Sequence, residues 1–175
     1  HVDFSGILLE QFRNPEIIEK YRRWLDIPQM LSDYRKAGNT EIVGMGYFHP
    51  IFPLIPKDDW DEQLALGVEV AYEIFGQRPK GFWPSEMAFC MDMIPALRKA
   101  GYEYVVVDHV HVRPAAEGQK INPFRPYKAK FEKAEITIIP RHRDLSNAQE
   151  SGLNPAWFLQ EVPKKLAEAG EQKQP

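Results

Sequence analysis

The feature that most constrains the fold is a short apolar run, Tyr104-Val105-Val106-Val107, that follows a helical segment. Because the run has no polar alternation, it predicts a strand that is covered on both of its faces. Strands of this kind belong to parallel sheets, in which helices connect one strand to the next. We therefore expect an α/β fold with a parallel sheet.

Helical and strand patterns alternate along the rest of the chain. Apolar residues recur at helical spacing over residues 58–75, and Gly76 is placed to close that helix. Further helices are expected at residues 14–24, 28–36, 92–100 and 154–169, strands at 40–43, 80–84, 104–107 and 135–139, a further strand at 2–4, and a long loop at 109–127. These strands are fewer than a closed (β/α)8 barrel of about 250 residues requires, so we expect an incomplete barrel.

Composition excludes several classes of function. The 175 residues correspond to one domain, and the net charge of -3, from 22 basic and 25 acidic residues, gives no footprint for nucleic acid or an anionic membrane. No apolar run approaches the roughly 18 residues of a membrane-spanning helix. The single cysteine, Cys90, excludes an internal disulfide and favours a reducing, cytoplasmic setting. The chain starts without Met or a signal-peptide pattern, which indicates a piece of a longer polypeptide.

Polar side chains follow the expected strands at the ends where catalytic loops of parallel α/β folds lie. Glu86 follows one strand, Asp108 the next, and Asp144 the last. Glu86 lies among bulky apolar residues, where an unpaired carboxylate must be bonded or put to chemical use. Hydrolysis of an acetal linkage requires two carboxyl groups, and Glu86 with Asp144 is the pair we favour. The alternative is structural: Glu86 caps a helix, and Asp144 pairs with Arg141 or Arg143.

Two histidines close to Asp108 admit two interpretations. On a strand, His109 and His111 would share a face and could meet one metal ion. We favour hydrogen bonds from both rings to sugar hydroxyl groups, so no metal ligand and no cofactor is assigned. Asp108 is expected to orient a neighbouring histidine or to bind a substrate hydroxyl, and the alternative is a loop cap.

Three further residues are candidates for substrate contact. His49 lies in an aromatic loop, Gly46-Tyr47-Phe48-His49-Pro50-Ile51, and Trp83 precedes Glu86 by three residues. Trp83 offers a flat face for a sugar ring, and Glu41 is expected to contact the substrate or support the site. For His49 the alternative is a loop histidine satisfied by the backbone.

With these residues in view, the chain resembles glycoside hydrolase family 57 over residues 2–169. The resemblance is carried by Gly81-Phe82-Trp83-Pro84-Ser85-Glu86-Met87-Ala88-Phe89, by Thr40-Glu41-Ile42-Val43 with the loop after it, and by Arg143-Asp144-Leu145-Ser146. It implies a retaining enzyme of α-1,4-linked glucans with an incomplete (β/α)7 barrel. It also implies that Glu86 is the nucleophile and Asp144 the general acid/base. Residues 1–169 would then be part of the catalytic barrel and residues 170–175 a disordered tail.

The family's first strand, with its His-Gln-Pro motif, and its closing strands are absent from this sequence, so we expect a fragment. The resemblance covers amylase, 4-α-glucanotransferase and branching activities alike, and the oligomeric state stays open. Two alternatives from other classes are a non-catalytic carbohydrate-binding relative and a metal-dependent polysaccharide deacetylase. The latter would require histidines and an aspartate to converge on one ion.

Overall fold

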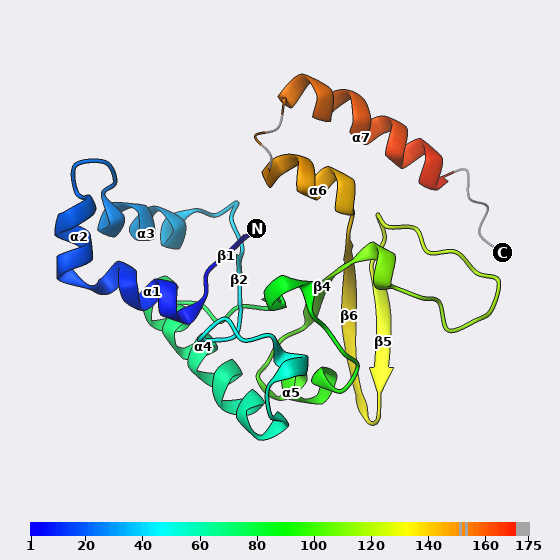
Figure 1. Ribbon diagram of the computed structural model, residues 1–175, viewed down its shortest axis with the longest axis horizontal. Coiled ribbons are helices and arrows are strands. Elements are labelled where there is room, and N and C mark those ends of the chain that lie inside the picture. Colours follow the sequence, from blue (N-terminus) through cyan, green and yellow to red (C-terminus); the bar gives the residue numbers. More distant parts are fainter. Residues whose placement is uncertain (151, 153, 171–175) are drawn as a thin grey trace.

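The computed structural model describes residues 1–150, 152 and 154–170 (Figure 1). The strands are β1 (Val2–Asp3), β2 (Ile42–Val43), β3 (Gly81–Phe82), β4 (Tyr104–Asp108), β5 (Tyr127–Phe131) and β6 (Ala134–Arg141). The α-helices are α1 (Gly6–Arg13), α2 (Pro15–Tyr21), α3 (Ile27–Lys36), α4 (Trp60–Phe75), α5 (Met93–Lys99), α6 (Arg143–Glu150) and α7 (Pro155–Gly170). Short 3-10 helices lie at Phe52–Leu54, Lys57–Asp59, Ser85–Met87 and His109–His111. The expected tail, apart from Gly170, lies outside the described residues.

Five of the strands run parallel, as the apolar run at β4 predicts. β1 pairs with β2, and β3, β4 and β6 pair in that order. A parallel bridge between Gly44 and Phe82 connects the two groups, with Gly44 N–H donating to the Gly81 carbonyl at 2.8 Å. The β4–β6 register places Asp108 opposite Arg141, so the last residues of two central strands meet. The prediction of an α/β fold with parallel strands is confirmed.

One strand differs from the expected parallel arrangement. β5 runs antiparallel to β6, with Tyr127 opposite Ile138 and Phe131 opposite Ala134. Only two residues connect these strands, and a connection this short allows only an antiparallel hairpin. Glu132 in this turn adopts a left-handed backbone conformation with φ of 52°. The predicted loop therefore ends in a strand.

Two clusters of buried apolar residues hold the helices on the sheet. The larger one joins Phe82, Val105 and Ile136 from three strands to residues of α4 and α5. The smaller one joins Leu9 of α1 to Ile42 of β2 and to the C-terminal half of α4. Figure 1 shows α1, α2 and α3 on one side of the molecule and the β5–β6 hairpin with α6 and α7 on the other.

Local capping explains where several helices begin and end. The Asn14 side chain accepts a hydrogen bond from Glu16 N–H at 2.8 Å, and Pro15 occupies the first helical position. Asp26 accepts from Gln29 N–H at 3.0 Å in the same way at the start of α3. α2 ends at Tyr21 and is thus shorter than the predicted helix. α4 ends at Gly76, whose φ of 74° is the left-handed conformation that favours glycine.

Two helices lie where no helix is predicted. α1 follows β1 directly, and a side chain at Gly6 would overlap the ring of Tyr47 in the neighbouring loop. α6 begins at Arg143, so Asp144 lies in its first turn.

Among the described helices, none combines the length and the apolar character that crossing a membrane requires.

Candidate active site at the carboxyl edge of the sheet

The carboxyl ends of the parallel strands present polar side chains at one edge of the sheet. Asp3 ends β1, Asp108 ends β4 and Arg141 ends β6. Glu86 follows β3 by four residues. Because neighbouring strands lie about 4.8 Å apart, the residues that end adjacent strands are within reach of one ligand. The edge predicted from the sequence thus carries these groups.

Glu86 lies on a strained turn. Both Glu86 and Met87 have left-handed backbones, with φ of 56° and 57°. Such conformations cost roughly 1–3 kcal/mol each for residues with a side chain, and they cluster at functional sites. The preceding residues Pro84 and Ser85 are buried and hold the turn against the fold, whereas Glu86 itself is exposed. The turn therefore presents the carboxylate outward from the sheet edge.

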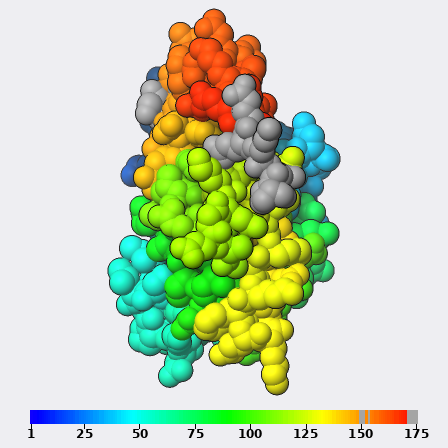
Figure 2. All heavy atoms as spheres, turned by 90° about the vertical axis from the view of Figure 1, so that its right-hand side faces the viewer, coloured from blue at the N-terminus to red at the C-terminus, as the bar shows by residue number. Residues whose placement is uncertain are grey.

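A cavity of about 1040 Å³ lies beside this turn. Its walls include Glu86, Asp108 and His111 as well as apolar and aromatic side chains such as Phe89 and Tyr127. The yellow-green segment around residues 110–125, seen in Figure 2, covers the face between the β5–β6 hairpin and α6–α7. Polar groups that converge within a largely apolar cavity are typical of a ligand site.

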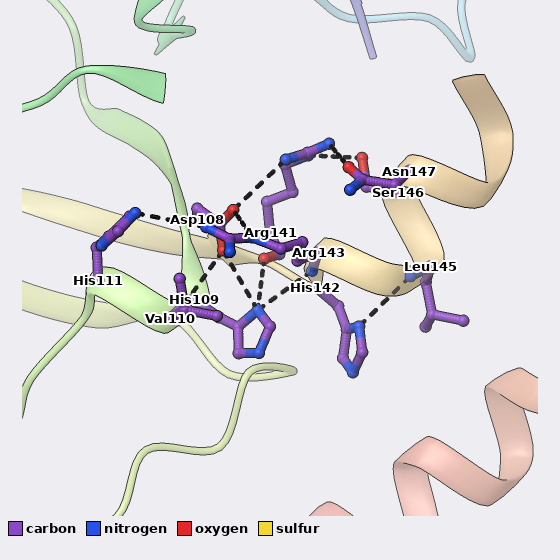
Figure 3. A network of polar contacts seen from close by, with 10 residues as sticks. All are labelled: Asp108, His109, Val110, His111, Arg141, His142, Arg143, Leu145, Ser146 and Asn147. Atoms are coloured by element: carbon purple, nitrogen blue, oxygen red, sulfur yellow. Dashed lines mark hydrogen bonds and ion pairs between the residues drawn. The ribbon is translucent and has the colours of Figure 1, made fainter. Parts of the chain in front are cut away.

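Asp108 is the buried carboxylate of the site, and it is held as an anion (Figure 3). Arg143 Nε donates to Asp108 Oδ2 at 2.7 Å, Arg141 Nη1 lies 3.6 Å from the same oxygen, and Val110 N–H donates to Oδ1 at 3.2 Å. Burial acts to raise the pKa of Asp108. The hydrogen bonds and the charges of Arg143 and His109 outweigh burial, so the pKa lies below its usual value.

The Asp108 network extends to the residues after β6. His109 Nδ1 lies 3.0 Å from the Arg141 carbonyl oxygen and 3.2 Å from the Arg143 backbone nitrogen. The Arg141 side chain donates to Ser146 Oγ and Asn147 Oδ1 of α6, each at 2.6 Å. These bonds fix the end of β4 relative to the start of α6.

Three rings stack beside the network. The His142 ring lies 4.9 Å from His109 and 5.3 Å from Phe124, with interplanar angles of 22° and 26°. Burial lowers the pKa of His142, and the charge of His109 lowers it further. A neutral His142 ring can accept a hydrogen bond at Nδ1 from Leu145 N–H, at 3.5 Å in the first turn of α6.

His109 and His111 do not share one face as a strand would require. They lie in a 3-10 helix, where His111 Nε2 is 3.5 Å from Arg143 Nη2 and His109 faces the Arg141 carbonyl. Within residues 1–150, 152 and 154–170, no group of three or more His, Cys, Asp or Glu side chains is placed to hold a metal ion.

Glu41 lies away from the other predicted site residues. It precedes β2, and its carboxylate accepts a hydrogen bond at 2.9 Å from the hydroxyl of Tyr104, the first residue of β4. Both residues therefore lie at the amino edge of the sheet, opposite the edge that carries Glu86 and Asp108. The substrate contact or supporting role expected of Glu41 stays a prediction.

The remaining predicted residues follow their strands but do not line the cavity. His49 is exposed, with a left-handed φ of 56°. Trp83 is half-buried, and its backbone N–H donates to the Gly44 carbonyl between β2 and β3. Asp144 is exposed in the first turn of α6. None of the three is among the described residues that line the cavity beside Glu86.

Two residues of this edge were missed by the sequence interpretation. Arg143 is the closest ionic partner of Asp108. The sequence interpretation considered it only as a possible partner of Asp144. Asp3 ends β1 opposite Val43, and desolvation raises its pKa although a backbone hydrogen bond and His49 act in the opposite direction. A carboxylate that ends the expected strand at residues 2–4 was the available signal for Asp3.

Comparison with known proteins gives the class and the family. A parallel α/β sheet with acidic and imidazole groups at its carboxyl edge is the usual arrangement of an α/β enzyme. The model of glycosyl hydrolase family 57 matches residues 1–150, and the chain belongs to this family. The resemblance drawn from the sequence is confirmed.

Individual relatives agree with the family. An alpha-amylase of Pyrococcus abyssi is 34% identical over 141 residues, covering 79% of this chain and 20% of that protein. A 4-alpha-glucanotransferase of Thermococcus litoralis is 34% identical over 140 residues, covering 80% of this chain and 20% of that protein. The crystal structure of 4-alpha-glucanotransferase from Thermococcus litoralis matches with a TM-score of 0.68 and 33% identity, over 84% of this chain and 22% of that chain. The chain thus spans about one fifth of the length of the curated relatives it matches.

Proposed function

We propose that residues 1–169 form part of an incomplete (β/α)7 catalytic barrel that cleaves α-1,4-linked glucans with retention of configuration. The names of the relatives, an alpha-amylase and a 4-alpha-glucanotransferase, support an α-glucan as the substrate. The observation that carries the proposal is Glu86 itself. It lies within the segment of family resemblance, on a strained turn, and on the wall of a cavity of about 1040 Å³.

In the proposed reaction, an oxygen of the Glu86 carboxylate attacks the anomeric carbon of the bound glucan. The bond to the leaving oxygen breaks, that oxygen takes a proton from a general acid, and a covalent glycosyl ester of Glu86 remains. Water or the hydroxyl group of another sugar then displaces Glu86, and the same acid, now a base, accepts the proton.

Asp144 is the proton donor implied by the family resemblance. Its place after β6, in the first turn of α6, supports the assignment. Asp108 is paired with Arg143, which lowers its pKa, so it suits substrate binding better than proton donation. We therefore propose Asp144 as the acid/base and test it against Asp108.

The test is Glu86→Gln in the full-length protein, assayed on maltooligosaccharides. We expect kcat to fall on the order of 10³-fold or more, because the amide cannot form the ester. Glu132→Gln is the matched control, since Glu132 is also an exposed glutamate with a left-handed backbone but does not line the cavity. A fluorinated glycosyl fluoride should label the peptide that contains Glu86, as measured by mass spectrometry. Full activity of Glu86→Gln would refute its role.

The proton donor is tested with Asp144→Asn and Asp108→Asn on substrates that differ in leaving group. Loss of a general acid slows poor leaving groups most, so Asp144→Asn should spare an activated aryl glycoside and slow a maltooligosaccharide. Asp108→Asn should affect both substrates alike. The reverse result would transfer the acid role to Asp108. Glucan binding without any turnover by the unmodified protein would instead support a non-catalytic carbohydrate-binding relative.

The cellular setting remains a prediction that rests on Cys90. A half-buried thiol on the cavity wall, in a chain with no second cysteine, is compatible with a reducing cytoplasm.

A further inference from the structure

The feature that carries a further inference is the position of Arg143 between Asp108 and His111. Its guanidinium donates from Nε to Asp108 Oδ2 at 2.7 Å and reaches His111 Nε2 from Nη2 at 3.5 Å (Figure 3). Asp108 and His111 both line the cavity beside Glu86, whereas Arg143 is not among its described lining residues. One arginine thus joins a buried anion to an exposed ring on the cavity wall.

The chemistry of the two side chains fixes the direction of the second contact. Arginine has five N–H donors and no acceptor, so His111 Nε2 must accept the hydrogen bond with its lone pair. An imidazole that accepts at Nε2 carries its proton on Nδ1 and is neutral. Nδ1–H is then the only ring donor that remains for a ligand.

Asp108 determines where the guanidinium lies. The carboxylate is buried and receives Val110 N–H on one oxygen and the Arg143 side chain on the other. Val110 lies between the two histidines, so the same carboxylate also fixes the turn that carries His111. The planar fork of arginine allows donation in two directions at once, which an ammonium group cannot reproduce with the same geometry.

We propose that Asp108 and Arg143 are positioning residues that hold His111 as the neutral ring protonated on Nδ1, so that this N–H donates to a hydroxyl group of the glucan. The identification of the ligand as a glucan rests on the proposed function. The protonation of His111 on Nδ1 does not depend on it. Neither Asp108 nor Arg143 needs to touch the reacting atoms in this arrangement. Their effect is transmitted through the ring of His111.

The experiment is long-range ¹H–¹⁵N NMR of the five histidines in the ¹⁵N-labelled chain. The signals of His111 are assigned by their loss in His111→Gln. We expect His111 to show a protonated Nδ1 and an unprotonated Nε2, whereas a free imidazole in water prefers the opposite tautomer. Arg143→Lys keeps a cation beside Asp108 and should return His111 to the common tautomer. Arg22→Lys, an exposed arginine at the end of α2, is the control and should leave the spectrum unchanged.

Kinetics in the full-length protein complete the test. Arg143→Lys should raise KM for maltooligosaccharides about 5–10-fold, which corresponds to one hydrogen bond, and leave kcat within about two-fold. A protonated Nε2 in the unmodified chain, or an unchanged His111 tautomer in Arg143→Lys, would overturn the proposal even if Glu86→Gln abolishes turnover. The expected tautomer in a protein whose Glu86→Gln variant stays active would instead refute the proposed function and leave the network intact.

Discussion

The two edges of the sheet each hold a carboxylate that is bonded by a side chain from elsewhere in the fold, but the two carboxylates have different environments. At the amino edge, Glu41 is 38% exposed and is bonded to the neutral Tyr104 hydroxyl, with His1 Nδ1 at 3.1 Å. At the carboxyl edge, the Asp108 side chain is 5% exposed and faces two arginines. Water, a phenol and a histidine surround the exposed carboxylate, whereas a buried carboxylate such as Asp108 requires fixed positive charge beside it.

The pKa values reflect this difference. Burial raises the pKa of Tyr104, and its hydrogen bond to Glu41 raises it further, so the phenol stays neutral. At Asp108, burial is outweighed by Arg143, and the pKa falls. The amino edge therefore connects strands without holding a buried charge. The carboxyl edge keeps an ionised, oriented group beside a cavity, which is the arrangement a binding site needs.

The sharpest test of this comparison is Asp108→Asn against Glu41→Gln. Removing one partner of a buried ion pair costs roughly 3–5 kcal/mol of unfolding free energy. Because the Arg143 side chain is 42% exposed and can reach water, we expect a loss of about 2–3 kcal/mol for Asp108→Asn. Glu41→Gln should cost less than about 1 kcal/mol, as exposed carboxylates do. Urea unfolding measures both, and equal losses would show that the two edges do not differ in this respect.

A second prediction concerns Gly81, the first residue of β3, at the amino edge. A methyl group at this position would overlap the ring of Tyr104, which pairs with it in the adjacent strand. The ring must then move and lose its bond to Glu41, so Gly81→Ala should cost about 1–3 kcal/mol. In a Tyr104→Ala background the same substitution should cost much less, because the ring is gone. A cost that is independent of Tyr104 would place the strain in the backbone of β3.

The parts of the fold that could be predicted are those with a local signal. The apolar run of β4 and the helical periodicity of α4 each identify an element without knowledge of its neighbours. β5 was missed because its alternation, Tyr127-Lys128-Ala129-Lys130-Phe131, follows a proline-rich loop, and its lysines face solvent as an edge strand requires. α1 was missed because its eight residues follow β1 with almost no connection.

For the candidate site, the sequence likewise predicts only those positions that follow from a local signal. The position of Glu86 and Asp108 at one edge could be predicted because the carboxyl ends of parallel strands meet there. The same rule places Glu41 at the opposite edge, because Glu41 precedes its strand. The bond from Arg143 to Asp108 depends on the register that sets Asp108 opposite Arg141, and no pattern within either segment specifies that register.

A smaller effect is expected from Tyr104→Phe, which removes one hydroxyl group and keeps the ring. The lost hydrogen bond to Glu41 is partly exposed, so the unfolding free energy should fall by about 0.5–1 kcal/mol. Activity of the full-length protein on maltooligosaccharides should not change, since both residues lie at the amino edge. A drop in kcat would connect this edge to catalysis and weaken the division drawn here.

The smallest expected effect is a pH dependence of stability that comes from His142 at the carboxyl edge. Burial and the charge of the stacked His109, with a further contribution from Lys165, lower the pKa of His142, while Asp144 acts in the opposite direction. The native state therefore binds this proton less readily than the unfolded chain. The corresponding stability is complete above the ordinary pKa of 6.5 and is lost as pH falls from that value toward the lower pKa of the folded state.

His142→Phe keeps an aromatic ring between His109 and Phe124 but has no proton to bind. Urea unfolding from about pH 8 to pH 5 should show a weaker decline in stability for His142→Phe than for the unmodified chain. Tyr104→Phe should follow the unmodified curve at a constant offset, because a phenol whose pKa is raised stays neutral throughout this range. If Tyr104→Phe altered the slope and His142→Phe did not, the titrating edge of the sheet would be the amino edge. That result would reverse the assignment of electrostatic function to the end that carries Asp108.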